Sequence, residues 1–159
     1  MSRRVIGISE MIVTDNPQDL LVTYSLGSCI GVTMFDPQAR VGGMIHYMLP
    51  ASKIAPGKAD ARPAMFADTG IPLMLKQLYD MGARRDNLEV RVAGGSKLMD
   101  QNKVFNIGER NFLILRKIMW KNNLLIKAKD VGGTIARTLS LELSSGQVLV
   151  KTSAGVTEL

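Results

Sequence analysis

The stretch LGSCIGVTMFDPQARVGGMIHY, residues 26–47, contains the only cysteine of the chain, Cys29, and its only histidine, His46. Runs of apolar and β-branched residues flank a central DPQA segment at 36–39. Asp suits the first position of a type I turn there, and Pro at the second position fixes φ at about −65°. The stretch is therefore predicted to form a β-hairpin.

The turn also sets the register of this predicted hairpin. With residues 36–39 as the turn, equal steps outward along both strands place Cys29 directly opposite His46. Opposed side chains in an antiparallel pair have Cβ atoms about 4.5–5.5 Å apart, which is within reach of a thiol and an imidazole. A bulge at Gly42-Gly43 would instead shift the pairing by one residue and move one side chain to the other face.

A thiol beside an imidazole has a chemical use. A free thiol, with a pKa of about 8.5, is mostly protonated at neutral pH. The imidazole can take its proton, the sulfur can attack a carbonyl carbon, and the imidazolium can then protonate the leaving group. A lone cysteine is nevertheless usually a buried structural residue. A lone histidine is likewise more often a hydrogen-bonded surface or core residue. The spacing alone leaves both interpretations open for Cys29 and His46.

Three further residues near the hairpin are candidates for the same site. Gly27 and Ser28 suit a tight turn whose backbone N–H groups can point at a developing oxyanion, although Ser28 is as simply explained as a turn residue. Thr23, on the preceding predicted strand, can orient the second imidazole nitrogen through its hydroxyl or carbonyl group. Other polar residues at element ends, including Asn111 and Arg137, are interpreted as caps or surface pairs.

Composition sets the broad class. The 159 residues, 46% hydrophobic and 21% charged, are typical of one globular domain that spans residues 1–159. A single cysteine cannot form an internal disulfide, and no apolar run approaches the length of a membrane span, about 18 residues. Both features predict a cytoplasmic protein. One His with one Cys is a poor ligand set and the Gly pairs lack phosphate-binding spacing, so neither a metal nor a cofactor is expected. The net charge of +6 has two interpretations, a solvated and mildly basic surface or the binding of an acidic partner. Aromatic residues are too few to favour nucleic acid.

Periodicity predicts an α+β fold in which helices pack outside a sandwich of largely antiparallel or mixed sheets. Strands are expected at 5–13, 20–26, 88–96, 124–130, 134–144 and 147–153, in addition to the hairpin. Helices are expected within 65–82 and at 108–122, and a loop at 50–62. Gly82 should end the first helix, and Pro72 should either start its regular part or kink it.

Seven sequence blocks occur in an order that resembles a known family. They are VIGISE at 5–10, SLGSC at 25–29, HYMLP at 46–50, FADTGI at 66–71, VAGGSKLM at 92–99, NIGERN at 106–111 and DVGGTIAR at 130–137. Together they resemble the CheD family of chemoreceptor glutamine deamidases, and the resemblance covers about residues 4 to 152.

The resemblance implies a cysteine hydrolase, a protein-glutamine glutaminase, similar in fold to bacterial deamidase toxins. It would convert glutamines of methyl-accepting chemotaxis receptors to glutamate and release ammonia. Cys29 would be the nucleophile, His46 the base and Thr23 the third member of the site. The implied partners are the cytoplasmic domains of the receptors, as substrate, and a CheC-type phosphatase. A monomer that neither inserts into membranes nor binds nucleic acid is expected.

Other functions remain open at this stage. The main alternative is a non-catalytic chemotaxis module that binds the phosphatase or the receptors without turnover. A basic nucleic-acid-binding domain with a structural cysteine is a weaker one. A third keeps the thiol chemistry but also acts on glutamyl methyl esters of the receptors.

Overall fold

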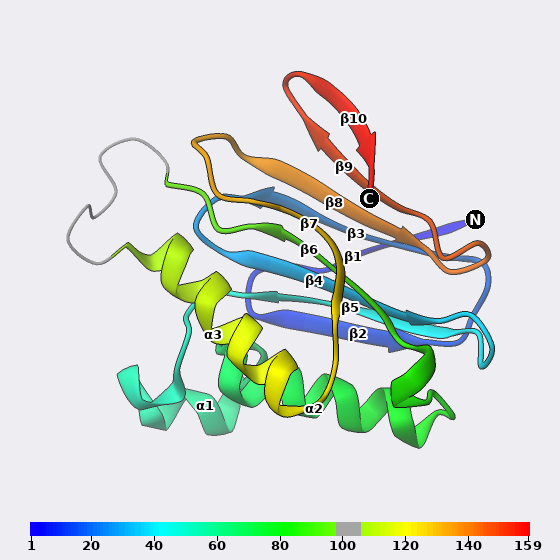
Figure 1. Cartoon of the computed structure of the whole chain (residues 1–159), viewed down its shortest axis with the longest axis horizontal. Coiled ribbons are helices and arrows are strands. Elements are labelled where there is room, and N and C mark those ends of the chain that lie inside the picture. Colours follow the sequence, from blue (N-terminus) through cyan, green and yellow to red (C-terminus); the bar gives the residue numbers. More distant parts are fainter. Residues whose placement is uncertain (98–105) are drawn as a thin grey trace.

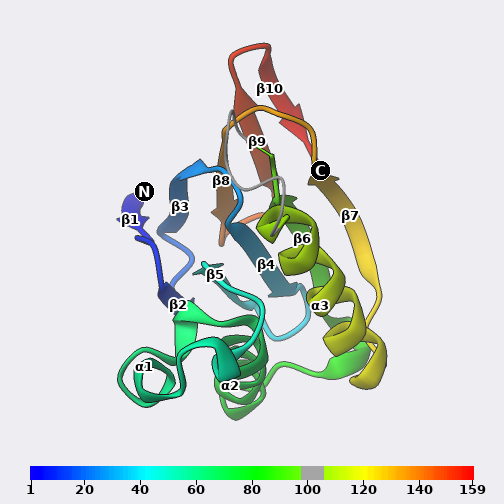
Figure 2. The same cartoon turned by 90° about the vertical axis from the view of Figure 1, so that its left-hand side faces the viewer.

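The structure, a computed structural model, describes residues 1–97 and 106–159, so the end of the VAGGSKLM block lies outside it. Two five-stranded sheets in these ranges pack against each other, and helices lie on the outer side of one of them (Figures 1 and 2). The β9–β10 hairpin projects at the opposite end from α1 and α2. The predicted α+β sandwich with mixed sheets and outer helices is confirmed.

Each sheet combines strands from distant parts of the chain. Sheet A contains, in spatial order, β1 (Ser2–Val5), β3 (Asp19–Leu26), β8 (Arg137–Glu142), β9 (Val148–Thr152) and β10 (Gly155–Glu158). Sheet B contains β2 (Glu10–Thr14), β5 (Val41–Tyr47), β4 (Ile30–Asp36), β6 (Glu89–Gly94) and β7 (Ile126–Val131). The pairs β1–β3 and β6–β7 are parallel, and the others are antiparallel.

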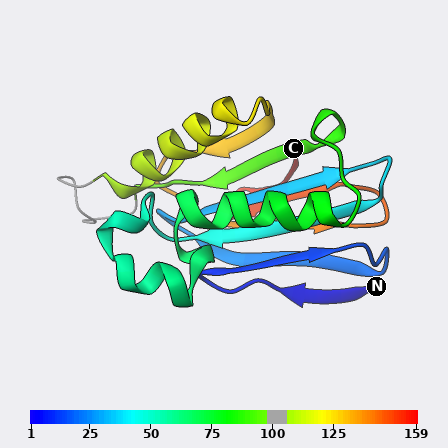
Figure 3. The same cartoon turned by 90° about the horizontal axis from the view of Figure 1, so that it is seen from below.

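Of the helices in the described ranges, α2 and α3 cover the outer face of sheet B, whereas α1 packs beside the neighbouring 3-10 turns. These helices are α1 (Pro56–Ala61), α2 (Ala67–Asp80) and α3 (Ile107–Lys121), with 3-10 turns at Ser52–Ile54, Pro63–Met65 and Arg85–Asn87. The view from below shows α2 running along this face (Figure 3). None of these helices is long and apolar enough to cross a membrane.

The end of α2 follows the predicted signal. Gly82 has a φ of +103°, and the N–H of Ala83 donates to Leu78 O at 3.0 Å, which is the hydrogen bond of a Schellman motif. Gly82 therefore ends the helix, as expected. Pro72 does not start the helix, because α2 already begins at Ala67 and Pro72 lies inside it with its ring exposed.

Two other predictions were wrong. Residues 5–13 form no single strand: β1 and β2 belong to different sheets, separated by a turn in which Ser9 has a φ of +64° and the Gly7 N–H donates to the Glu10 carboxylate. The segment 50–62 is also not all loop, because α1 forms there with Pro56 at its first position, where the missing N–H costs nothing. The strand β10 was not predicted.

The hairpin forms, but its register differs from the prediction. Asp36 pairs with Val41 and Gly31 with His46, so the connection has four residues, 37–40. The Asp36 carboxylate accepts the N–H groups of Gln38 and Ala39 at 2.8 and 3.0 Å, which wraps the turn around this side chain. The slip is two residues, and the continuous pairing leaves no bulge at Gly42-Gly43. Because side chains alternate with a period of two, Cys29 stays on the His46 face but is diagonal to it.

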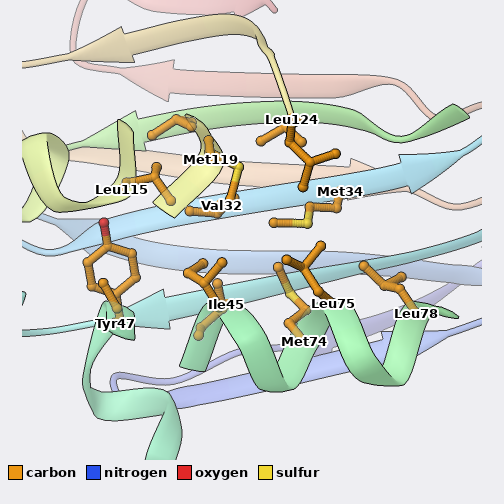
Figure 4. Packing of buried hydrophobic residues seen from close by; sticks show 14 of the residues in the cluster. Val32, Met34, Ile45, Tyr47, Met74, Leu75, Leu78, Leu115, Met119 and Leu124 are labelled. Carbon is orange, nitrogen blue, oxygen red and sulfur yellow. The ribbon is translucent and has the colours of Figure 1, made fainter. Parts of the chain in front are cut away.

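Two apolar cores result from this layering. One lies between sheet B and the helices, where Val32, Met34 and Ile45 meet Met74 and Leu78 of α2 and residues of α3 (Figure 4). The other lies between the two sheets and is built from residues of both. His46 and Thr23 face this second core, so the candidate site forms at the interface between the sheets.

Candidate active site

Cys29 lies on a short loop, residues 27–29, that connects β3 of sheet A to β4 of sheet B. Gly27 is buried, whereas Ser28 and Cys29 are partly exposed. The Cys29 side chain also packs against the core between the sheets. The loop therefore presents the sulfur at the rim of that interface.

The backbone of this loop is anchored by the end of β6. Gly27 O accepts the Ser96 N–H at 2.8 Å, and Cys29 O accepts the Gly95 N–H at 2.9 Å. Gly94 has a φ of +113°, and a Cβ atom there would collide with Cys29 O. Only glycine therefore permits this close contact between the two segments.

His46 is held rigidly in the middle of sheet B. Its strand, β5, lies between β2 and β4, and the side chain is 1% exposed. Gly31 is directly opposite on β4 and contributes no side chain on that face. The imidazole consequently points into the interface between the sheets, where Thr23 of β3 meets it.

The contact between Thr23 and His46 defines the imidazole tautomer. Thr23 Oγ1 lies 2.7 Å from His46 Nδ1 and 2.7 Å from the carbonyl oxygen of Ile6. The hydroxyl has one proton, which it donates to the Ile6 carbonyl. Its oxygen therefore accepts the proton on Nδ1, and the lone pair of the neutral ring is on Nε2.

The predicted direct thiol–imidazole contact is not formed. His46 Nε2 is buried and makes no hydrogen bond with any residue that the structure describes. The reason is the register: Gly31, and not Cys29, is opposite His46. Cys29 precedes Gly31 by two residues, so it is diagonal to His46, and its side chain packs against the core between the sheets.

Burial shifts the pKa values of both groups toward their neutral forms. It raises the pKa of the Cys29 thiol, with a smaller opposing effect from the backbone N–H of the same residue. It lowers the pKa of His46 to about 4. At neutral pH the site therefore holds a thiol and a neutral imidazole, and not the ion pair of a preformed thiolate and imidazolium.

The sequence of this chain matches a known protein family. The family model described as "CheD chemotactic sensory transduction" matches residues 48–152. The chain belongs to the CheD family. A relative from Solibacter usitatus, "Probable chemoreceptor glutamine deamidase CheD", is 45% identical over 100% of this chain and 94% of its own, which includes the site segments.

Other CheD relatives are similar over nearly their whole length. A "Probable chemoreceptor glutamine deamidase CheD 1" from Syntrophus aciditrophicus is 48% identical over 95% of this chain and 94% of its own. A "Chemoreceptor glutamine deamidase CheD" from Thermotoga maritima is 39% identical over 99% and 96%, respectively.

Sequence reasoning missed two buried polar residues that contact the segments of the candidate site. Asn111, interpreted as a cap or surface residue, is fully buried and donates to Ser28 O. Arg137 is also buried, and it donates to Ser96 Oγ at 2.7 Å and to Asp130 at 3.1 Å. Their places in the NIGERN and DVGGTIAR blocks were the available signal, but polar side chains at element ends usually face solvent.

The depressed pKa of His46 predicts how stability depends on pH. The unfolded ring has a pKa of about 6.5. The folded ring stays neutral until about pH 4, so its contribution to stability is complete above pH 6.5 and is lost as the pH falls toward 4. Between pH 7.5 and pH 5 this group should cost about 2 kcal/mol of unfolding free energy.

Urea unfolding at the two pH values tests this expectation. His46→Asn is the matched control, because its amide can still donate to Thr23 but does not titrate. The variant should lose about 2 kcal/mol less than the wild type over this range. Equal losses in both proteins would contradict the lowered pKa of His46.

Proposed function

We propose that this protein deamidates glutamine side chains in the cytoplasmic domains of methyl-accepting chemotaxis receptors, through a thioester on Cys29. The observation that carries this proposal is the hydrogen bond from His46 Nδ1 to Thr23, which leaves Nε2 as a base on the face that Cys29 shares. The printed names of the relatives supply the substrate class.

The first half of the reaction acylates the thiol. As Cys29 Sγ attacks the carboxamide carbon, His46 Nε2 accepts the thiol proton and the carbonyl oxygen becomes an oxyanion. Backbone N–H groups of Ser28 and Cys29 stabilise this charge. The C–N bond then breaks, the leaving nitrogen takes the proton from Nε2, and ammonia departs from the thioester.

Hydrolysis of the thioester completes the cycle. His46 Nε2 takes a proton from a water molecule, whose oxygen attacks the thioester carbon. The C–S bond breaks and the proton on Nε2 returns to sulfur, which leaves glutamate on the receptor and a neutral Cys29. Thr23 keeps the ring in one tautomer throughout, because the Ile6 carbonyl occupies its only proton.

The neutral resting state is compatible with this chemistry. A general base can remove the thiol proton during the attack, so no thiolate has to be present beforehand. Hydrogen bonds between nucleophile and base are often long in the absence of substrate and shorten in the complex. The substrate carboxamide would also displace water from the site.

The net charge of +6 supports the choice of an acidic partner. Receptor helices that carry glutamates before and after deamidation fit such a surface, and their association should weaken with salt. A CheC-type phosphatase as second partner, and a monomeric state, stay predictions of the family resemblance.

Mass spectrometry of receptor cytoplasmic fragments tests the proposal. Fragments incubated with the protein should show glutamine sites converted to glutamate, with one ammonia released for each site. The same protein with its single thiol blocked by iodoacetamide is the control and should convert none. No conversion by the untreated, folded protein over several receptors would reject the function.

A further inference from the structure

Asn111 connects the nucleophile loop to the strand of the base. It lies on α3, is 0% exposed, and uses both protons of its amide nitrogen. Nδ2 donates to Ser28 O at 2.9 Å and to Met48 O at 3.0 Å. Ser28 directly precedes Cys29, and Met48 follows His46 by two residues. One buried side chain thus ties together the two segments that carry the proposed chemistry.

Peptide geometry gives the contact with Ser28 a directional effect. A trans peptide is planar, and its C=O and N–H groups point in opposite directions. With Ser28 O turned inward to Asn111, the N–H of Cys29 points the other way. Ser96 has the same effect one peptide earlier, because it holds Gly27 O and thereby directs the Ser28 N–H.

Both of these N–H groups remain available to a substrate. Within the described residues, the Ser28 N–H makes no hydrogen bond, and the Cys29 N–H interacts only with the sulfur of its own side chain. The Cys29 N–H is thus adjacent to the sulfur that would attack. An oxygen on the carbon bound to that sulfur would lie close to these donors.

Two backbone contacts join α3 to its surroundings, and neither involves the side-chain amide of Asn111. The Tyr47 hydroxyl, which points toward α3 (Figure 4), donates to Asn111 O at 2.6 Å. At the start of the same helix, a Cβ atom on Gly108 would collide with the carbonyl oxygens of Gly95 and Ser96. The helix therefore packs directly against the segment that holds the other carbonyls of the loop.

We infer that Asn111 is a positioning residue that creates the oxyanion hole of this site. Without it, the Ser28–Cys29 peptide loses the partner of its carbonyl oxygen and can rotate. The rotation would replace the Cys29 N–H donor by a carbonyl oxygen, which repels an oxyanion. Asn111 acts through this peptide and does not touch the substrate.

This inference rests on the proposed deamidase function, and the test separates the two. The variants Asn111→Asp and Asn111→Ala are compared with Tyr47→Phe, which removes a buried hydrogen bond to the same helix but leaves the Ser28 carbonyl paired. The readouts are kcat and KM for a receptor fragment and the rate at which iodoacetamide alkylates Cys29. Alkylation proceeds at a saturated carbon and forms no oxyanion, so it reports on the thiol alone.

Both Asn111 variants should lose about 10²-fold in kcat, the typical effect of one oxyanion donor, with KM and the alkylation rate within about threefold of wild type. Tyr47→Phe should unfold at lower temperature but keep kcat within about threefold of the wild-type value. An unchanged kcat in the Asn111 variants, or an equal loss in Tyr47→Phe, would overturn the inference. An inactive wild type would reject the proposed function first and the inference with it.

A measurement on the wild type covers the case in which both Asn111 variants fail to fold. A peptide with an aldehyde in place of the glutamine carboxamide should add to Cys29 and form a tetrahedral hemithioacetal, whose oxygen mimics the oxyanion. The amide NMR signals of Ser28 and Cys29 should then move downfield, as expected when an N–H gains an oxygen partner. Adduct formation without these shifts would overturn the inference.

Discussion

Replacement of Cys29 by alanine is expected to reduce ammonia release from receptor fragments by at least about 10⁴-fold, to the level seen without protein. The reason is chemical, because the chain has only one cysteine and no thioester can form without it. Without the thiol, water activated by His46 would have to attack the amide directly, and no covalent intermediate would divide the reaction into two easier steps. Ammonia release and mass spectrometry of the receptor sites measure the effect.

The alanine variant should fold and bind as the wild type does. Cys29 is only partly buried, and its loop is held through the backbone carbonyl oxygens of residues 27–29, which the substitution leaves intact. Cys29→Ser is the matched variant: a hydroxyl of similar size, with a far higher pKa, should retain only a trace of activity. Full glutamine conversion by Cys29→Ala would contradict the mechanism. If neither the wild type nor Cys29→Ala converts glutamine, and both affect receptor signalling equally, the non-catalytic binding module would be favoured.

The His46→Asn variant is expected to lose about 10³-fold in kcat for deamidation, within the range for removal of a general base. The asparagine amide can still donate to Thr23 Oγ1, so the contact between the sheets remains. What it lacks is the lone pair at the position of Nε2, which would accept the proton of the thiol and later that of water. Single-turnover ammonia release measures the acylation step directly.

Alkylation of Cys29 by iodoacetamide distinguishes a general base from an ion pair. Because burial raises the pKa of the thiol and keeps the imidazole neutral, the alkylation rate should change by less than about threefold in His46→Asn at pH 7. A large fall in this rate would show that the wild type holds a thiolate stabilised by His46.

Thr23→Val, which frees the ring to change tautomer, should lose less deamidase activity than His46→Asn.

The pairing of Cys29 with His46 illustrates how far sequence reasoning reached. The turn at 36–39 correctly predicted the hairpin. It failed on the register, because Asp36 folds the turn around its own carboxylate and lengthens the loop to four residues. Loop length depends on such local hydrogen bonds, which periodicity does not encode. A slip of an even number of residues leaves Cys29 diagonal to His46, so the predicted direct opposition was wrong.

The sequence by itself determined the elements with local signals. Apolar periodicity and the stop at Gly82 predicted α2, the stripe of α3 predicted its extent to within one residue, and the block pattern indicated the family. These features depend on residues that are close in the chain. Strong local preferences therefore express themselves without knowledge of the packing.

Only the tertiary structure decided how the site is assembled. Thr23 and His46 belong to different sheets, and their 2.7 Å contact exists because the sheets pack face to face at that point. Asn111 reaches Ser28 from a helix more than eighty residues away along the chain. Buried polar groups need partners, but the sequence does not say which distant group satisfies them. That choice follows from the packing of both sheets and α3, because packing alone brings these distant atoms within hydrogen-bonding distance.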